Sequence, residues 1–209
     1  MTIRKKSGYH SLHWTEHPKG EEAEHMGKIS LVLGGTKSGK TAYAQRLAAE
    51  LSSKKGKNIT YIATARALDE GMKRRIAAHR SSRPKEWITV EEPIKISRIL
   101  QKAAVDKAAV IIDCLTMLST NILMNLGEEP DPEGALRLVT SEVKAILTQA
   151  VEIEPDLIII SNHVETGLVA PTRLGGIFQD IAGISHQIIA SAANTVILMT
   201  AGIPQKLKG

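Results

Sequence analysis

The stretch ISLVLGGTKSGKTAYAQRLAAEL, residues 29–51, decides the fold. Its first part, ISLVLGG (29–35), is a short apolar run that ends in glycines and predicts a buried strand. Its second part predicts a helix from residue 39 to about residue 53. A strand that enters a helix through glycines is the context that a phosphate-binding loop requires.

The turn between these two elements matches the pattern G-x-x-x-x-G-K-[ST]. Its glycines let the backbone curl, so that successive N–H groups point inward at phosphate oxygens. The positive end of the following helix dipole adds to the attraction. The alternative is a glycine-rich turn that binds no ligand. The predicted phosphate-binding residues are Gly34, Gly35, Thr36, Lys37, Ser38, Gly39, Lys40 and Thr41.

A nucleotide with Mg²⁺ needs a cation for its phosphates and oxygen ligands for its metal. Lys40 is expected to reach the β- and γ-phosphates, and the Thr41 hydroxyl to ligate Mg²⁺. Asp113 closes the apolar run AAVIID (108–113), where a carboxylate can hold the metal directly or through water. The alternative role for Asp113 is to cap the next helix. We therefore predict Thr41 and Asp113 as the metal ligands.

Further apolar runs alternate with helical patterns along the rest of the chain. Strands are predicted at 58–64, 87–92, 108–114, 156–162 and 194–200. Helices are predicted at 69–80, 94–105, 115–126, 132–151 and 173–193. Strands that are apolar on both faces and alternate with helices favour a parallel sheet that is covered on both sides. The expected fold class is α/β, of the P-loop NTPase type (RecA-like), with a mostly parallel sheet and helices on both faces.

Length and composition fit one globular domain with an extension. The chain has 209 residues, of which 43% are hydrophobic and 23% charged. Residues 1–26 show no helical or alternating apolar period, so we expect a flexible extension there and the domain at 27–209. The excess of 27 Lys and Arg over 22 Asp and Glu fits phosphorylated ligands, and it is too small to indicate nucleic acid binding.

The composition also bears on the compartment. No apolar run approaches the ~20 residues that span a bilayer, and the first residues lack the apolar segment of a secretory signal. The single cysteine, Cys114, excludes an intrachain disulfide and a four-cysteine zinc site. We therefore expect a cytoplasmic protein without a membrane span.

The segment MKRRIAAHRSSRPKEW, residues 72–87, is the most basic part of the chain. His79 and Arg80 end the helix that is predicted there. An imidazole nitrogen can attack phosphorus and hold a nucleotidyl group covalently. The alternatives are a capping histidine or a surface histidine on a solvated helix face.

Several of these segments resemble a known family in their order and spacing. They are GGTKSGKT (34–41), YIATA (61–65), DEGMKRRIAAHRSSRPKEW (69–87), VIIDCLTMLSTNIL (110–123) and FQDIAGISHQ (178–187). They are similar to the bifunctional adenosylcobinamide kinase / adenosylcobinamide-phosphate guanylyltransferase family of cobalamin biosynthesis. Many NTPases share the phosphate loop, whereas the run R-I-x-x-H-R-x-x-R-P-x-x-W (75–87) is much more specific. The resemblance covers residues 27–209.

The resemblance implies two linked reactions. A nucleoside triphosphate, GTP or ATP, phosphorylates the aminopropanol hydroxyl of adenosylcobinamide. GTP then guanylylates a histidine, which passes GMP to the cobinamide phosphate. On the matching positions His79 carries GMP and Lys40 serves the kinase reaction, in a homotrimer that binds a corrinoid. Further nucleotide contacts are implied for Thr64, Ala65, Arg66, Arg80, Ser81, Ser82, Arg83 and Glu91.

One loop departs from the family pattern. The family usually reads N-E-V-G-x-G-I-V-P after the fifth strand, whereas this chain reads NHVETGLVA at 162–170. His163 stands in place of a carboxylate and Glu165 in place of a glycine. Two alternatives to the bifunctional enzyme therefore stay open. One is a P-loop kinase of another small alcohol that leaves His79 idle, and the other is a nucleotide-binding regulatory protein without transfer chemistry.

Overall fold

The computed structural model describes residues 27–67, 69–127, 129–167 and 169–209. The extension expected at residues 1–26 lies outside the described residues. The strands are β1 (Ile29–Gly34), β2 (Asn58–Ala63), β3 (Ile88–Glu91), β4 (Lys107–Asp113), β5 (Asp156–Asn162), β6 (Thr195–Thr200) and β7 (Ile203–Lys208). The helices are α1 (Lys40–Lys55), α2 (Glu70–Ser81), α3 (Ile96–Ala104), α4 (Leu115–Met124), α5 (Pro132–Ala150) and α6 (Arg173–Ala192).

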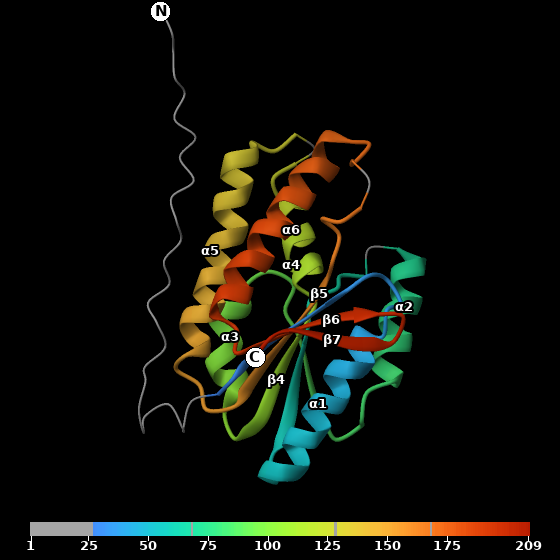
Figure 1. The fold of residues 1–209 in the computed structure, drawn as a ribbon. Coiled ribbons are helices and arrows are strands. Elements are labelled where there is room, and N and C mark those ends of the chain that lie inside the picture. Colours follow the sequence, from blue (N-terminus) through green and yellow to red (C-terminus); the bar gives the residue numbers. More distant parts are fainter. Residues whose placement is uncertain (1–26, 68, 128, 168) are drawn as a thin grey trace, which may run out of the picture.

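The strands form one sheet in the order β3-β2-β4-β5-β1-β6-β7 (Figure 1). All neighbouring pairs are parallel except β6 and β7, which run antiparallel. Strand β5 lies between β1, which enters the glycine turn, and β4, which ends at Asp113. The carboxyl ends of these three strands therefore meet at one edge of the sheet. The mostly parallel sheet that the sequence predicts is confirmed.

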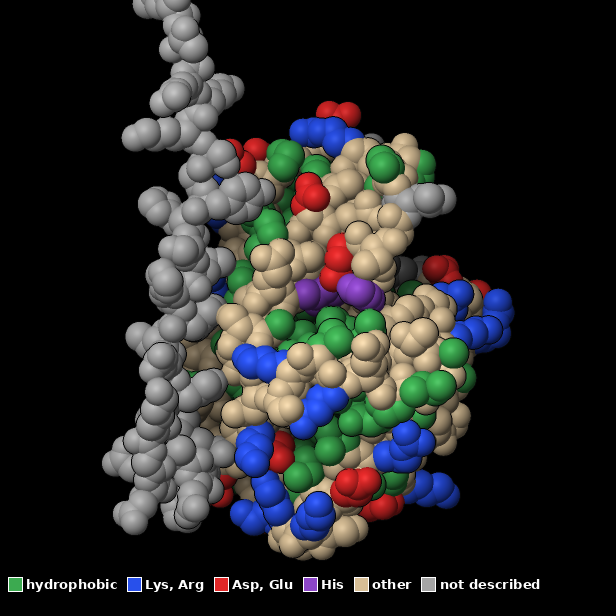
Figure 2. Space-filling model, in the orientation of Figure 1, with side chains coloured by type: hydrophobic (Ala, Val, Ile, Leu, Met, Phe, Trp, Pro, Cys, Tyr) green, Lys and Arg blue, Asp and Glu red, His purple; other side chains and the backbone are tan. Residues whose placement is uncertain are grey.

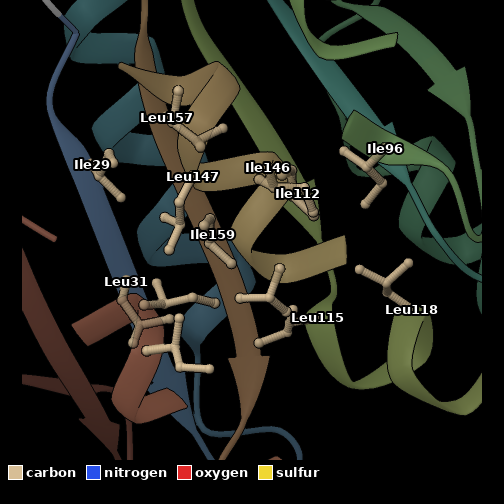
Figure 3. Packing of buried hydrophobic residues seen from close by; sticks show 14 of the residues in the cluster. Ile29, Leu31, Ile96, Ile112, Leu115, Leu118, Ile146, Leu147, Leu157 and Ile159 are labelled. Carbon is tan, nitrogen blue, oxygen red and sulfur yellow. The ribbon is translucent and has the colours of Figure 1, made fainter. Parts of the chain in front are cut away.

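Helices cover both faces of the sheet because consecutive apolar strand residues point to opposite faces. On β4, Ile112 belongs to an apolar cluster with helices α3 to α6, whereas Ile111 belongs to a second cluster with α1. Figure 3 shows the first cluster, in which Ile112 packs near Leu115 and Ile146. The predicted α/β fold, with a mostly parallel sheet and helices on both faces, is confirmed.

Helix α2 differs from the other helices because it buries none of its residues. The helix begins where Asp69 accepts a hydrogen bond from the main-chain N–H of Met72, at 2.7 Å. In Figure 1 it stands at the margin of the fold, away from the helices that cover the first cluster. It ends in the basic segment that contains His79.

The last strand, β7, was not predicted from the sequence. It follows a tight turn in which Ala201 has φ 51° and Gly202 has φ 84°, the conformations that a two-residue hairpin needs. Every residue of β7 is exposed, so the apolar pattern of a buried strand is missing. The Ala201-Gly202 pair was the available indication of the hairpin.

None of the helices among the described residues is long and apolar enough to cross a membrane.

Candidate nucleotide-binding site

The glycine turn forms a loop that main-chain hydrogen bonds fix from two sides. From β5, the N–H of His163 donates to the carbonyl of Gly34 at 3.1 Å. From the β6–β7 turn, the N–H of Gly202 donates to the carbonyl of Ser38 at 3.0 Å. Gly39 has φ 93°, a left-handed conformation that favours glycine, and α1 begins at the next residue. The sequence therefore folds this turn into a fixed loop at the N-terminus of a helix, as an anion-binding site requires.

The first glycine is also required by space. A Cβ added to Gly34 would lie 2.7 Å from the main-chain oxygen of Met199 on β6. At Gly35 an added Cβ would meet no atom within 4 Å. The two glycines thus have different roles, because only Gly34 is held against the neighbouring strand.

Lys40 lies back over the loop that precedes it. Its Nζ donates to the carbonyl of Gly35 at 2.9 Å. Burial lowers the pKa of Lys40, and the neighbouring Cys114 and Asp113 side chains partly oppose that shift. Ser38 contributes a buried hydroxyl that has no hydrogen-bond partner among the described residues. An ammonium and an unsatisfied hydroxyl inside the loop fit the oxygens of a bound phosphate.

The metal ligands predicted from the sequence lie at the edge where this loop begins. Thr41 is half-buried in the first turn of α1, and Asp113 is half-buried at the end of β4. One carboxylate oxygen of Asp113, Oδ2, accepts a short hydrogen bond from the Tyr61 hydroxyl. Among the described residues, no hydrogen bond to the other oxygen, Oδ1, is found. A hydroxyl and a carboxylate are the oxygen ligands that Mg²⁺ prefers, so this pair fits the metal.

Tyr61 joins Asp113, a metal ligand predicted from the sequence, to the basic segment, and sequence reasoning missed it. Its ring is completely buried, and burial together with the charge of Asp113 raises the pKa of Tyr61. The guanidinium of Arg83 lies 3.7 Å from the centre of this ring. Arg83 also donates to the Thr89 hydroxyl at 3.4 Å. Arg83, Tyr61 and Asp113 thus form one connected row, in which the basic segment touches the strand end through an aromatic ring.

The other predicted residues of the basic segment are exposed. His79 and Arg80 lie in the last turn of α2, followed by Ser81 and Ser82. The hydroxyls of Ser81 and Ser82 donate to main-chain carbonyls of the same turn. Within the described residues, no hydrogen bond or ion pair joins His79 to the phosphate loop. The single chain therefore brings Arg83 to the strand ends and leaves His79 facing outward.

Predicted contacts on β2 and β3 fall at the same edge of the sheet. Glu91 ends β3 and pairs in register with Ala63, which pairs on its other side with Asp113. Thr64 follows Ala63, but its hydroxyl is buried and makes two hydrogen bonds to the main chain of Cys114. It accepts from the N–H of Cys114 at 2.7 Å and donates to the carbonyl of Cys114 at 2.9 Å. Ala65 and Arg66 are half-buried beyond it. A nucleotide contact of these residues stays a prediction.

Fold and site together define a class: a P-loop nucleotide-binding protein with a phosphate loop after β1 and a carboxylate, Asp113, at the end of β4. Residues 30–207 match the family model described as cobinamide kinase / cobinamide phosphate guanyltransferase. The chain belongs to this family, which confirms the family predicted from its sequence motifs.

Two relatives, from Pseudomonas aeruginosa and Escherichia coli, agree with this assignment. The chain is 39% identical over 179 residues to the bifunctional adenosylcobalamin biosynthesis protein CobP of Pseudomonas aeruginosa, covering 86% of this chain and 96% of that protein. It is 32% identical over 183 residues to the bifunctional adenosylcobalamin biosynthesis protein CobU of Escherichia coli, covering 85% and 98%. A solved KaiC-like protein of Pyrococcus horikoshii OT3 has a TM-score of 0.47 and 17% identity, covering 83% of this chain and 71% of that one.

Proposed function

We propose that this chain is a bifunctional transferase of cobalamin biosynthesis, which phosphorylates adenosylcobinamide and then transfers GMP to the product. The family match over residues 30–207 carries this proposal, because that range contains both the phosphate loop and the histidine segment. Relatives that match over nearly their whole length bear the name of a bifunctional cobalamin biosynthesis protein. The phosphate loop and the Arg83–Tyr61–Asp113 row add chemistry that suits nucleotide substrates.

In the kinase reaction, the loop residues 34–41 hold the phosphates of GTP or ATP. The main-chain N–H groups and the Lys40 ammonium stabilise the charge that the transferred phosphoryl group and the departing diphosphate carry. Thr41 and Asp113 hold Mg²⁺, which neutralises phosphate oxygens when it is bound. Tyr61 keeps the Asp113 carboxylate in one orientation by bonding to its Oδ2.

In the guanylyl reaction, His79 attacks the α-phosphorus of GTP. A nitrogen–phosphorus bond forms, the bond from the α-phosphorus to the bridging oxygen breaks, and pyrophosphate leaves. A phosphate oxygen of the cobinamide phosphate then displaces His79 and takes the GMP. The contacts implied by the family, from Thr64 to Arg66, from Arg80 to Arg83 and at Glu91, hold the guanosine triphosphate.

The exposed position of His79 leaves it accessible to a nucleotide and to a second substrate. None of the residues of α2 is buried within the single chain, so the surface of this helix is free to pack against another subunit. We include a homotrimer in the proposal. The proposed compartment is the cytoplasm, where nucleoside triphosphates are made.

The direct experiment follows the corrinoid product by mass spectrometry. Purified protein is incubated with adenosylcobinamide, Mg²⁺ and either ATP or GTP. We expect the phosphate ester with both nucleotides or with one of them, and the GDP adduct only when GTP is present. Lys40→Ala should abolish the first product, and His79→Ala should abolish only the second. Neither product forming with the wild-type protein would contradict the proposal.

A further inference from the structure

Four polar side chains form a connected network at the end of β5. The ring of His186, on α6, lies between Ser161 and Glu165: its Nε2 is 2.7 Å from the Ser161 hydroxyl and its Nδ1 is 2.6 Å from Glu165 Oε1. The same carboxylate oxygen lies 3.5 Å from Nε2 of His163. The exposed fraction of the side chains increases along this row, from 6% at His186 to 24% at Glu165 and 27% at His163.

The bonding pattern fixes the protons of the inner members. An ionised carboxylate only accepts hydrogen bonds, so Nδ1 of His186 carries the proton and donates to Glu165. Nε2 of His186 then accepts from the Ser161 hydroxyl. Burial lowers the pKa of His186, in keeping with this neutral ring. Glu165 is therefore held in place by the His186 ring, which is in turn held by Ser161 of β5.

Ser161, His186 and Glu165 are connected in the order of a serine, histidine and acid triad, but the serine is not the reactive group. Ser161 is completely buried in β5, so no substrate reaches its hydroxyl. The open end of the row is His163. The carboxylate of Glu165 lies 3.5 Å from Nε2 of His163, so its charge favours a proton on Nε2 and leaves Nδ1 as the basic nitrogen.

His163 lies beside the phosphate loop. Its main-chain N–H bonds to Gly34, and the residue before it, Asn162, pairs in register with Gly34. On the other side of β5, Asp113 pairs with Ile160. Ligands of such sheets bind beyond the carboxyl ends of the strands, so an acceptor that meets a triphosphate here approaches this edge. Figure 2 shows histidine side chains at the surface next to an acidic side chain on this side of the molecule.

We propose that His163 is the catalytic base of the kinase reaction and that Glu165, His186 and Ser161 position it. The acceptor hydroxyl oxygen bonds to the γ-phosphorus, the bond from that phosphorus to the β,γ-bridging oxygen breaks, and the nucleoside diphosphate leaves. The hydroxyl proton passes to Nδ1 of His163 and then to water. This role rests on the kinase activity proposed above.

The ionisable groups that face His163 are Glu165 in its own loop and His186 on α6, and its neighbour from β1 is the carbonyl of Gly34. Glu165→Gln should slow phosphoryl transfer, because the His163 ring loses the carboxylate that positions it, while the KM for nucleotide stays unchanged.

The test is single-turnover phosphoryl transfer to adenosylcobinamide with saturating nucleotide. We expect His163→Gln to slow transfer by about 100-fold. Added imidazole should restore part of the rate of His163→Gly. Val169→Ala, at a residue of the same loop that is 94% exposed, is the matched control and should behave as wild type.

A second assay, guanylylation of the protein by GTP, helps to distinguish a failure of the role of His163 from a failure of the proposed kinase function. We expect His163→Gln to accept GMP normally, which also shows that this variant is folded. A His163→Gln protein that phosphorylates the substrate as fast as wild type would overturn the role of His163 alone. A wild-type protein that does not phosphorylate adenosylcobinamide at all would instead overturn the proposed kinase function.

Discussion

Removing the Tyr61 hydroxyl tests the row that joins the basic segment to Asp113, the proposed metal ligand. Tyr61→Phe keeps the ring, so the contact with the Arg83 guanidinium at 3.7 Å is retained. The substitution removes the hydrogen bond to Asp113 Oδ2. A hydrogen bond to a charged group contributes about 1.5–3 kcal/mol. Asp113 is half-buried and its carboxylate keeps contact with water, so we expect the lower value, about 1.5 kcal/mol, in the free energy of unfolding.

The substitution should also affect metal-dependent binding, because the carboxylate loses the group that orients it. We expect weaker nucleotide binding in the presence of Mg²⁺ and unchanged binding in its absence. Urea denaturation measures the first effect, and calorimetric titration of nucleotide with and without Mg²⁺ measures the second. The loss of stability should lower the Tm by about 3–6 °C.

Tyr43→Phe is the matched control. Tyr43 is half-buried on α1, and no hydrogen bond of its hydroxyl is found in the part of the chain that the structure describes. Its substitution should change the free energy of unfolding by less than about 0.5 kcal/mol. Equal stabilities and equal Mg²⁺ effects for the two variants would refute the orienting role of Tyr61.

Three further predictions concern packing and charge. Gly34→Ala should lower the free energy of unfolding in urea by about 1–3 kcal/mol, because its Cβ would lie 2.7 Å from a main-chain oxygen of β6, whereas Gly35→Ala should leave stability unchanged. Because burial lowers the pKa of His186 below its ordinary 6.5, the unfolded chain binds the proton first, and stability should fall as the pH drops through 6.5. In His186→Gln, the urea midpoint of unfolding should change less with pH between about pH 7 and about pH 5 than in wild type. A dependence on pH as steep as that of wild type would contradict a neutral His186 ring in the folded protein. The buried Glu142 accepts from the N–H and hydroxyl of Ser97 at 2.9 and 3.0 Å, so Glu142→Ala should cost about 1–3 kcal/mol and speed hydrogen exchange at the start of α3.

The sequence predicted the buried strands well because their apolar runs are local. A strand such as β4, with residues Ala108 to Ile112 almost wholly buried, needs no knowledge of its neighbours to be recognised. The exposed edge strand β7 has no such run, and its pairing to β6 depends on the turn at Ala201. Likewise, the sequence indicated helix α2 but not that it buries none of its residues.

For the site, the same distinction holds between local and distant contacts. The phosphate loop is contiguous, so its residues were predicted together, and Asp113 was predicted because it ends a strand. Tyr61 was missed because it reads as one more apolar strand residue and its partner is 52 positions away. The pairing of Glu165 with His186 was missed for the same reason, since it joins a loop to a helix 21 positions later.

The most direct measurement of the central claim is the site of the covalent nucleotide. The protein is incubated with α-labelled GTP without corrinoid, digested under alkaline conditions, and the labelled peptide is mapped. We predict one GMP group on His79, stable to alkali and lost in acid, which is absent from His79→Ala while phosphorylation of adenosylcobinamide continues. A label on another residue, or a label that persists in His79→Ala, would contradict the assignment.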